Sequence, residues 1–410
     1  MDKINIIVSC PTLMHAHQFS AALYKTNRLK MFITTIWYKP NSRLHKFISA
    51  IPIIGKKIRY SLLKRYYDGL PANKVMTHSI GEIVYQIKKQ IPYVRHNQIS
   101  IYYRADSFDK YVAKTIKEMD YDIFVGCEEN SLYSFKTAKQ HGKITILDLT
   151  QVHWKYLEYL RKKYPIFKSI QQDNVFYRAS AIKEEEYKYV DYIITSSAFA
   201  RDTLVNNGIA SDKIRVIGLG FDTLKFKCKE VYNINSKGPL KLLFAGSITR
   251  RKGINLILQA VKQLENVELT IVGPMAEKKE YLDKYNVKFT YFPFLHHNDL
   301  AEQFKNTDLF VFPSYLDSWG KVVLEAMACG TPVIVTENTG SKDVVMQGGG
   351  KIIPVDDLES LKSAINYYKD NRILLEEDGK KASVVAQNYT WENYYMQVNN
   401  AISEIINESL

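Results

Sequence analysis

The sequence predicts an α/β protein of two doubly wound domains, each built on a parallel sheet. Short apolar runs alternate with helix-length amphipathic stretches almost from end to end, which is the pattern of parallel strands joined by helical crossovers. The chain has 410 residues, which exceeds what one core usually supports at roughly 150 residues per domain. A polar segment at residues 221–239 interrupts the alternation near the middle.

Six apolar runs in the first half are the expected strands of the first domain, residues 1–220. The last four have the Val- and Ile-rich continuity of buried parallel strands. The expected strands are Ile4–Ser9, Met31–Ile36, Tyr121–Gly126, Lys143–Asp148, Tyr192–Thr195 and Ile214–Ile217.

Residues 221–239 are rich in Lys, Asn and Ser and contain a Gly-Pro turn signal, which predicts a linker. The alternation then restarts over residues 240–390 and predicts a second domain of the same class. Residues 391–410 are predicted to form one more amphipathic helix. The expected strands of the second domain are Lys241–Ala245, Val267–Val272, Lys288–Phe292, Leu309–Phe312 and Pro332–Thr336.

The net charge of +13 favours anionic partners, which include nucleic acid, anionic membranes and phosphorylated substrates. We do not expect nucleic acid, because no recognised binding motif accompanies the charge. No apolar run approaches the roughly 18 residues that span a bilayer, and the first residues lack the layout of a signal peptide. A cytoplasmic protein is therefore expected. The four scattered cysteines favour reduced thiols.

The most informative stretch of the sequence runs from Pro313 to Val333. It predicts a strand end, a polar loop, a helix that begins near Gly320, and a further strand. A helix N-terminus at the carboxyl end of a parallel sheet is where open α/β proteins bind anionic ligands. A carboxylate on that helix, such as Glu325, can accept two hydrogen bonds from a vicinal diol.

A second informative stretch, residues 243–258, predicts a strand that runs into a basic, glycine-containing loop and then a helix. Arg250, Arg251, Lys252 and Gly253 form the loop. This arrangement places cations beside phosphate groups. A basic surface turn is the alternative.

The stretch from Asp317 resembles the signature of the retaining, family-4-type glycosyltransferases of the GT-B fold, also described as glycosyl transferases group 1. In that signature two acidic residues, separated by seven others, precede an Ala-Met-Ala-x-Gly-x-Pro-Val run. Asp317 and Glu325 have this separation. The resemblance implies that Asp317 contacts the transferred sugar and Glu325 the nucleotide ribose. The first acid is usually Glu in the family, and the alternative is a capping Asp317 with a surface Glu325.

The basic loop resembles the diphosphate clamp of the same family, which implies a catalytic role for Lys252. The family usually has an Arg directly after the first Gly of the loop, where this chain has Ser247. Arg251, or less favourably Arg250, is therefore expected to supply the second positive charge.

Further donor contacts are implied by shorter matches, and the resemblance covers about residues 190–400. Gly246 begins the basic loop, Gly273 lies in a strand-to-loop turn beside the nucleotide, and Phe294 lies in the base-side loop. Gly320 and Lys321 open the helix that carries Glu325.

The acceptor half carries weaker signals. His153 follows the strand that ends at Asp148, and the resemblance places a His near the reacting centre there; a structural or exposed His is the alternative. His15 and His17 stand where the family often has a Gly-Gly loop, and they could touch the acceptor or cap a helix. No metal site or other cofactor is expected. The charge run Glu184–Glu186 is expected mostly on a solvated helix face.

Residues 39–65 contain many basic and no acidic residues, interleaved with apolar ones. Such a segment can make a peripheral contact with an anionic membrane. A helix packed by its apolar face, with its basic residues in water, is the alternative.

Together these features predict a retaining, metal-independent transfer of a sugar from a UDP- or GDP-sugar to a hydroxyl of a cell-envelope or lipid-linked glycan. The resemblance assigns acceptor binding to residues 1–220 and donor binding to residues 240–390, with the last helix packed back on the first domain. The alternatives are an epimerase or phosphorylase on the same fold, and a non-catalytic subunit that binds a glycan or a partner enzyme.

Overall fold

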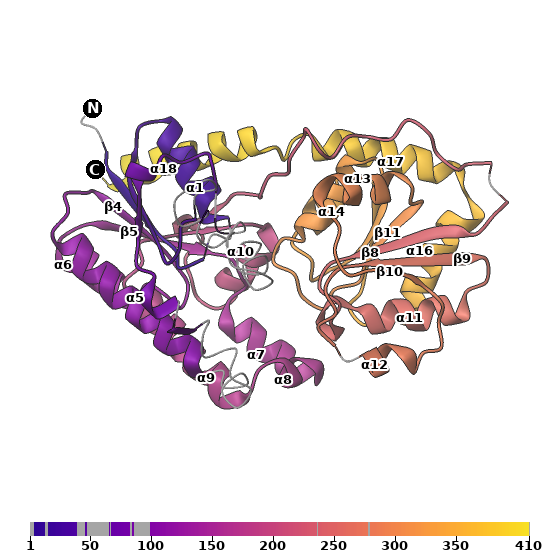
Figure 1. The fold of residues 1–410 in the computed structure, drawn as a ribbon, viewed down its shortest axis with the longest axis horizontal. Helices are drawn as coiled ribbons and strands as arrows, with labels where there is room; N and C mark the ends of the chain where they lie inside the picture. The colour runs from indigo at the N-terminus through magenta and orange to yellow at the C-terminus, as the bar shows by residue number, and fades with distance from the viewer. Residues whose placement is uncertain are drawn as a thin grey trace.

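In the computed structural model the chain forms two α/β domains that lie side by side (Figure 1). The structure describes residues 4–12, 15–38, 67–82, 99–235, 237–277 and 279–409, together with residues 46, 65, 84 and 85. The described strands form a seven-stranded sheet in the order β3-β2-β1-β4-β5-β6-β7 and a six-stranded sheet in the order β10-β9-β8-β11-β12-β13. All paired strands are parallel. The predicted fold class is therefore confirmed.

The N-terminal sheet and its helices follow the expected alternation. Its strands are β1 (Ile6–Ser9), β2 (Leu29–Thr34), β3 (Val75–Thr77), β4 (Ile123–Cys127), β5 (Ile144–Leu149), β6 (Tyr192–Thr195) and β7 (Ile214–Val216). Its helices are α1 (Ala16–Lys25), α5 (Ile99–Lys117), α6 (Leu132–Gln140), α7 (Trp154–Lys163), α8 (Ile166–Ile170), α9 (Asp173–Tyr187) and α10 (Ala198–Val205), with 3-10 turns at Ala72–Lys74 and Ser211–Lys213.

The C-terminal sheet has six strands, and the last helix of the chain leaves this domain. The strands are β8 (Leu240–Ala245), β9 (Val267–Val272), β10 (Thr290–Phe292), β11 (Leu309–Phe312), β12 (Val333–Thr336) and β13 (Gly350–Ile353). The helices are η3 (Arg250–Lys252), α11 (Ile254–Gln263), α12 (Lys279–Asp283), α13 (His297–Lys305), α14 (Lys321–Ala328), α15 (Lys342–Val345), α16 (Leu358–Asp370), α17 (Ile373–Ala386) and α18 (Trp391–Ser409).

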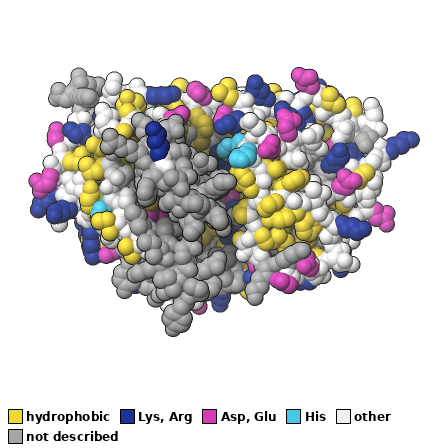
Figure 2. All heavy atoms as spheres, viewed as in Figure 1, with side chains coloured by type: hydrophobic (Ala, Val, Ile, Leu, Met, Phe, Trp, Pro, Cys, Tyr) yellow, Lys and Arg dark blue, Asp and Glu magenta, His cyan; other side chains and the backbone are white. Residues whose placement is uncertain are grey.

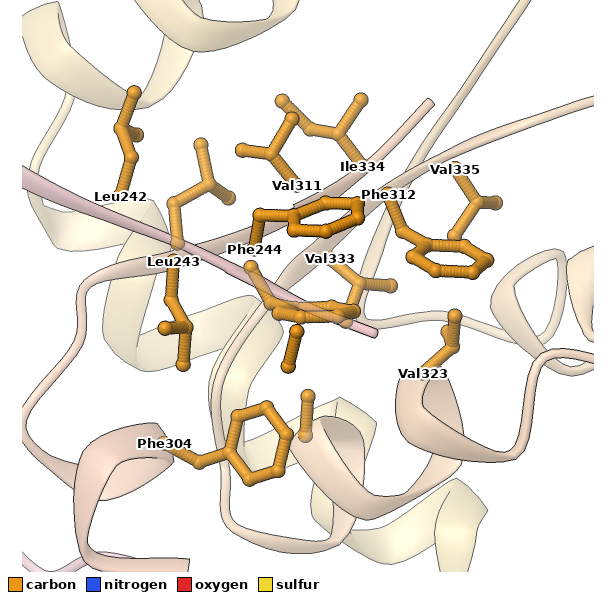
Figure 3. Close-up of a cluster of buried hydrophobic side chains, with 14 of the residues drawn as sticks. Leu242, Leu243, Phe244, Phe304, Val311, Phe312, Val323, Val333, Ile334 and Val335 are labelled. Carbon is orange, nitrogen blue, oxygen red and sulfur yellow. The ribbon is translucent and has the colours of Figure 1, made fainter. Parts of the chain in front are cut away.

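The core of the C-terminal domain fixes the strand ends from which the loops of interest leave. The rings of Phe244 on β8 and Phe312 on β11 stack with centroids 6.1 Å apart, and both side chains are buried (Figure 3). Val323 on α14 packs into the same cluster. Burying side chains of this size stabilises a fold by about 1.5–3 kcal/mol each. The positions of β8, β11 and α14 are therefore set by apolar packing.

Helix α18 returns to the N-terminal domain and packs against α1 (Figure 1). Val398 and Ile402 of α18 are buried in the cluster that also holds Phe19 of α1. The amide of Asn399 donates to the Ala22 carbonyl at 3.0 Å. The residues that enter and leave the C-terminal domain also meet, because Phe221 pairs with Thr390.

Two strands were not expected from the sequence, β3 and β13, and most other strands differ from the expected bounds by one or two residues. Within the segment that predicted a linker, Phe221 and Phe226 are buried in the core of the C-terminal domain. Of residues 39–65, only Lys46 and Arg65 belong to the described residues. The prediction of a membrane contact for residues 39–65 therefore concerns residues that lie outside the described part of the chain.

The visible surface carries both signs of charge (Figure 2). Lys and Arg side chains are interspersed with Asp and Glu around the molecule, and hydrophobic side chains gather on the face of the C-terminal domain. None of the helices in the described part of the chain combines the length and apolar composition that crossing a bilayer requires.

Candidate active site

The basic loop leaves the end of β8 and enters α11 through the short helix η3. The Oγ1 of Thr249 accepts a hydrogen bond from the backbone N–H of Lys252 at 3.3 Å, which caps η3. The turn between β8 and η3 lies close to the turn that follows β9. At Gly273, where φ is +139°, a Cβ atom would lie 1.9 Å from the carbonyl oxygen of Gly246. Any side chain at Gly273 would therefore push the two turns apart.

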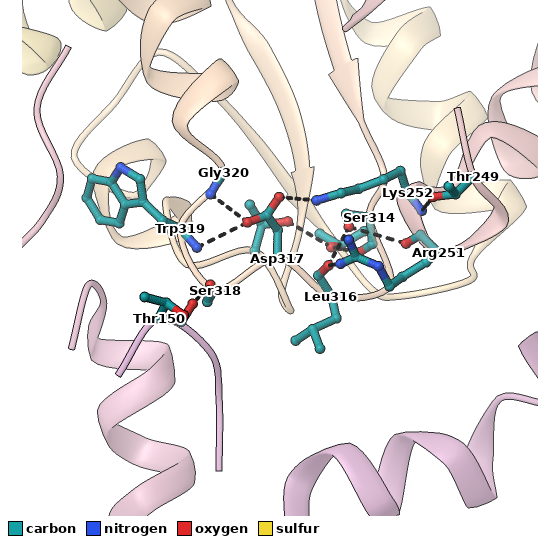
Figure 4. Close-up of polar contacts among 12 residues, drawn as sticks. Thr150, Thr249, Arg251, Lys252, Ser314, Leu316, Asp317, Ser318, Trp319 and Gly320 are labelled. Carbon is teal, nitrogen blue, oxygen red and sulfur yellow. Dashed lines mark hydrogen bonds and ion pairs between the residues drawn. The ribbon is translucent and has the colours of Figure 1, made fainter. Parts of the chain in front are cut away.

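Asp317 connects the basic loop to the start of α14 (Figure 4). One carboxylate oxygen, Oδ2, forms an ion pair with Nζ of Lys252. The other oxygen, Oδ1, accepts hydrogen bonds from the backbone N–H of Gly320 at 2.8 Å and of Trp319 at 3.2 Å. Two of the residues that the sequence singled out for the donor site, Lys252 and Asp317, are thus in direct contact.

The contact of Asp317 with Lys252 and the burial of both side chains shift the pKa of each group. Burial alone would raise the pKa of Asp317, but the charge and hydrogen bond of Lys252 and the charge of Arg251 outweigh burial and lower it. Burial lowers the pKa of Lys252, and the attraction of Asp317 offsets only part of that effect. Asp317 is therefore a carboxylate that is held in place by a cation and by two amides.

The structure separates the two arginines of the basic loop. Arg251 Nη1 donates a hydrogen bond to the carbonyl oxygen of Leu316 at 2.7 Å, next to Asp317 (Figure 4). Arg250 pairs instead with Glu277, with its Nε 3.3 Å from the carboxylate of that residue. Of the two candidates for the second positive charge, Arg251 is the one beside Lys252 and Asp317.

Glu325 lies on α14, one turn beyond its first residue. The residue is 6% exposed, and burial raises the pKa of its carboxyl group above the ordinary value. Lys321, the first residue of α14, places its Nζ 3.3 Å from Oε1 of Glu325. A desolvated carboxylate of this kind binds hydroxyl donors more strongly than one in water does.

Two further residues predicted to belong to the site, Phe294 and His153, differ in their exposure to solvent. Phe294 follows β10, is 51% exposed and contacts the ring of His296 edge-on, with ring centroids 5.0 Å apart. His153 is only 1% exposed, and its Nδ1 accepts a hydrogen bond from the backbone N–H of Lys155 at 3.2 Å, which caps α7. The ring of His153 therefore lies in the packing of the N-terminal domain rather than at its surface.

The N-terminal domain touches the Asp317 loop through residues that the sequence did not single out. Ser318 Oγ donates to the carbonyl oxygen of Thr150 at 2.6 Å (Figure 4). The carbonyl oxygen of Ser318 accepts from Ser197 Oγ at 2.7 Å. Serines and threonines at strand ends are common in α/β proteins, so no sequence signal marks these pairs.

Other charged groups of the N-terminal domain are paired internally. His15 Nε2 lies 2.8 Å from Oδ1 of Asp148, and the charge and hydrogen bond of Asp148 outweigh burial and raise the pKa of His15. In the run expected on a solvated helix face, Glu186 is instead fully buried. The solvated-face prediction was wrong for this residue, because its carboxylate accepts the backbone N–H groups of Glu129 and Ser131 at 2.8 and 2.9 Å.

A cavity of about 270 Å³ lies where the two domains face each other beside the Asp317 loop. The C-terminal domain contributes Arg251 and Leu316 to its wall. The N-terminal domain contributes residues of α7, α8 and α9, among them Arg161 and Lys183.

The sequence of the chain is similar to those of known glycosyltransferases. Residues 227–385 match the model of the family described as glycosyl transferases group 1. A D-inositol 3-phosphate glycosyltransferase of Pseudarthrobacter chlorophenolicus is 27% identical over 54% of this chain and 60% of its own length. The capsular polysaccharide biosynthesis glycosyltransferase CapM of Staphylococcus aureus is 26% identical over 52% of this chain and 62% of its own length. The chain thus spans about three fifths of the length of these curated relatives.

Solved structures resemble the whole chain at low sequence identity. A sucrose-phosphate synthase from Thermosynechococcus elongatus has a TM-score of 0.70 and 17% identity, with 99% of this chain and 100% of that chain covered. Anabaena Alr3699/HepE, solved in complex with UDP and glucose, has a TM-score of 0.63 and 14% identity, with 98% and 100% covered. At such identities the likeness establishes the GT-B fold. Residues 227–385 are therefore similar to the glycosyl transferases group 1 family, and the chain as a whole has the two-domain GT-B fold.

Proposed function

We propose that the protein is a retaining glycosyltransferase that moves a sugar from a UDP- or GDP-sugar to a hydroxyl of a cell-envelope or lipid-linked glycan, without a metal ion. The observation that carries this proposal is the contact of Lys252 with Asp317 beside the start of α14. This contact brings a cation and a carboxylate together next to the N-terminus of α14.

Lys252, Arg251 and the N-terminus of α14 stabilise the departing diphosphate in this proposal. The leaving group gains negative charge in the transition state, and groups fixed near it in advance lower the barrier most. The first-turn amides of a helix have no partners within the helix and favour anions. These three sources of positive potential take the place that a bound cation has in other enzymes of phosphate chemistry.

Glu325 binds the ribose of the nucleotide in this proposal, because its buried carboxylate can accept two hydroxyl donors. Asp317 positions the transferred sugar. Phe294, which is 51% exposed, contacts the base. The relatives support the donor and acceptor classes only by analogy: Alr3699/HepE was solved with UDP, and CapM is named for capsular polysaccharide biosynthesis.

The cavity beside Asp317 receives the acceptor, since Leu316 and Arg251 join its wall to the donor loops. Hydrogen bonds from Ser318 and Ser197 hold the two domains together at this point. Such closure keeps water away from an activated donor.

Calorimetric titration of UDP and GDP in EDTA-containing buffer tests the donor site. We expect one nucleotide to bind, and Glu325→Ala and Lys252→Ala each to weaken it at least tenfold, about 1.4 kcal/mol. The exposed residues Lys262 and Glu268 supply matched controls, Lys262→Ala and Glu268→Ala, which should bind as wild type does. Absence of binding by folded protein would reject the donor site and favour a non-catalytic subunit.

The reaction type is tested with a sugar donor that carries the nucleotide found to bind. Nuclear magnetic resonance of the product should show the donor's anomeric configuration retained. Inversion would reject the retaining mechanism. Product formed without any acceptor would favour an epimerase.

A peripheral contact of residues 39–65 with an anionic membrane, at its cytoplasmic face, completes the proposal. Cosedimentation with phosphatidylserine vesicles, but not with phosphatidylcholine vesicles, is the expected result. Replacement of Lys56, Lys57 and Arg59 by Gln should abolish it. Unchanged cosedimentation would assign membrane binding to another surface.

A further inference from the structure

The charge balance of the cavity beside Asp317 specifies the acceptor more closely than the family does. The following inference rests on the proposed function, because it takes this cavity as the acceptor site. Leu316 precedes Asp317 and Arg251 precedes Lys252, so the cavity opens directly beside the pair that holds the donor. Helix α8 also contacts η3, which carries both basic residues.

Lys183, the first cation of the N-terminal wall, is surrounded by carboxylates. Its Nζ lies 2.8 Å from Oε2 of Glu128 and 2.9 Å from Oε1 of Glu129. The lysine side chain is only 5% exposed. Two carboxylates face one ammonium group, so this part of the wall carries no excess positive charge for a phosphate.

Arg161, the second cation of this wall, uses both ends of its guanidinium within the protein. One end forms an ion pair with Asp173, and Nη1 donates to the carbonyl oxygen of Phe167 at 3.1 Å. The guanidinium also lies over the ring of Phe176, 4.5 Å from its centroid. Arginine binds phosphate most strongly when two N–H groups of its fork face the ligand, and in Arg161 both ends of the fork face the protein.

Another carboxyl group lies beneath the cavity. Glu186 is buried and accepts the backbone N–H of Glu129, which lines the cavity. Burial, together with the charges of Glu128 and Asp109, holds the pKa of Glu186 well above its usual range even though it accepts two amides. Burial disfavours the anionic form of this carboxyl group, and it would disfavour an added anion at the same place in the same way.

The remaining wall suits a sugar ring. A volume of about 270 Å³ is at the small end of ligand sites. Phe167, Phe176 and Leu316 supply apolar surface, and Gln151, Gln171 and Glu129 supply hydrogen-bonding groups. We propose that this cavity takes one uncharged, hydroxyl-bearing sugar ring as the acceptor and discriminates against phosphorylated sugars.

Paired acceptor probes test the proposal: methyl hexopyranosides and their 6-phosphates, titrated into protein saturated with the nucleotide that binds it. Saturation-transfer NMR measures both affinities. We expect the neutral member of at least one pair to bind at least tenfold more tightly than its phosphate. Gln171→Trp, which narrows the cavity from a half-buried position, should remove binding of both.

Glu129→Gln tests the electrostatic cause, since it removes one carboxylate and leaves the contact of Lys183 with Glu128. This variant should reduce the preference for the neutral sugar at least threefold. Glu118→Gln makes the same chemical change at an exposed position of the N-terminal domain and should leave the preference unchanged. Thermal unfolding checks that the three variants are folded.

The outcomes separate this inference from the proposed function. If a 6-phosphate binds more tightly, if no neutral glycoside binds, or if Glu129→Gln leaves the ratio unchanged, the inference is overturned. The donor site stands in each of these cases, provided that nucleotide binding still depends on Lys252 and Glu325. Loss of nucleotide binding itself would reject the proposed function first.

Discussion

Asp317 holds Lys252 through one carboxylate oxygen and the backbone amide of Gly320 through the other. Removal of either interaction affects both the basic loop and the start of α14, since one side chain joins them. Breaking a buried ion pair is costly because the remaining charge loses its partner. The family-typical residue at this position is one methylene longer, so the short side chain of Asp317 is a specific feature of this loop.

Asp317→Glu should destabilise the protein although Glu is usual in the family. The longer side chain can still reach Lys252, but its oxygen no longer fits the amides of Trp319 and Gly320, a loss of about 1–2 kcal/mol. Asp317→Asn should keep an amide-accepting oxygen and lose the ion pair. Urea unfolding of both variants measures these losses. A Glu variant as stable as wild type would show that the amide contacts contribute little.

Gly253→Ala should be far more damaging than Gly142→Ala. Both glycines have positive φ, +78° and +67°, so both substitutions incur about 1 kcal/mol or more of backbone strain. Only at Gly253 would the new Cβ lie 2.0 Å from the carbonyl oxygen of Pro313, whereas Gly142 has open space. We expect a loss of about 3 kcal/mol or more at Gly253, together with weaker nucleotide binding. Equal losses in chemical denaturation would exclude the clash.

The sequence predicted the fold class and the donor loops because both depend on local signals. Buried parallel strands are continuous apolar runs, and β6, β9 and β11 have the predicted bounds. Strand β3 is three residues long, and β13 begins in a run of glycines. Neither strand has the length or composition that signals a strand without its neighbours.

Contacts between distant segments could not be predicted in the same way. Lys183 and Glu186 belong to a charged run that has the composition of a solvated helix, and only tertiary packing buries them. The choice between Arg250 and Arg251 depended on which side chain turns toward Leu316. Proximity of Ser318 to Thr150 required the relative placement of two domains.

His153→Asn should preserve stability better than His153→Ala if the imidazole serves as a helix cap. Asn can replace the acceptor that Nδ1 offers to Lys155, whereas Ala cannot, at a cost of about 1 kcal/mol. Burial lowers the pKa of His153 to about 4. The contribution of the neutral imidazole to the free energy of unfolding is therefore complete above about pH 6.5, the ordinary pKa of His. This contribution decreases as pH falls toward 4. Loss of transfer activity in the Asn variant without loss of stability would instead assign His153 to catalysis.

Ser318→Ala should loosen the contact between the domains without disturbing the donor loops. The hydroxyl donates to the Thr150 carbonyl, while the backbone of residue 318 keeps its bond from Ser197. We expect kcat/KM to fall several-fold, consistent with loss of one hydrogen bond of about 1 kcal/mol. Nucleotide affinity should stay within twofold of wild type. Small-angle scattering should show a larger radius for the variant, and identical scattering would assign closure to other contacts.

Glu325→Gln should stabilise the nucleotide-free protein at neutral pH and weaken nucleotide binding at least tenfold. Burial raises the folded-state pKa of Glu325, so the folded protein bears a cost for its charge that the unfolded chain does not. This cost is absent below about pH 4.3, the ordinary pKa of Glu, and complete above the raised value. The free energies of unfolding of variant and wild type should therefore be equal in acid. As pH rises, the variant should become more stable than wild type by on the order of 1 kcal/mol. Thermal unfolding at several pH values measures this difference. A variant less stable than wild type at pH 7 would show that the contact with Lys321 outweighs burial.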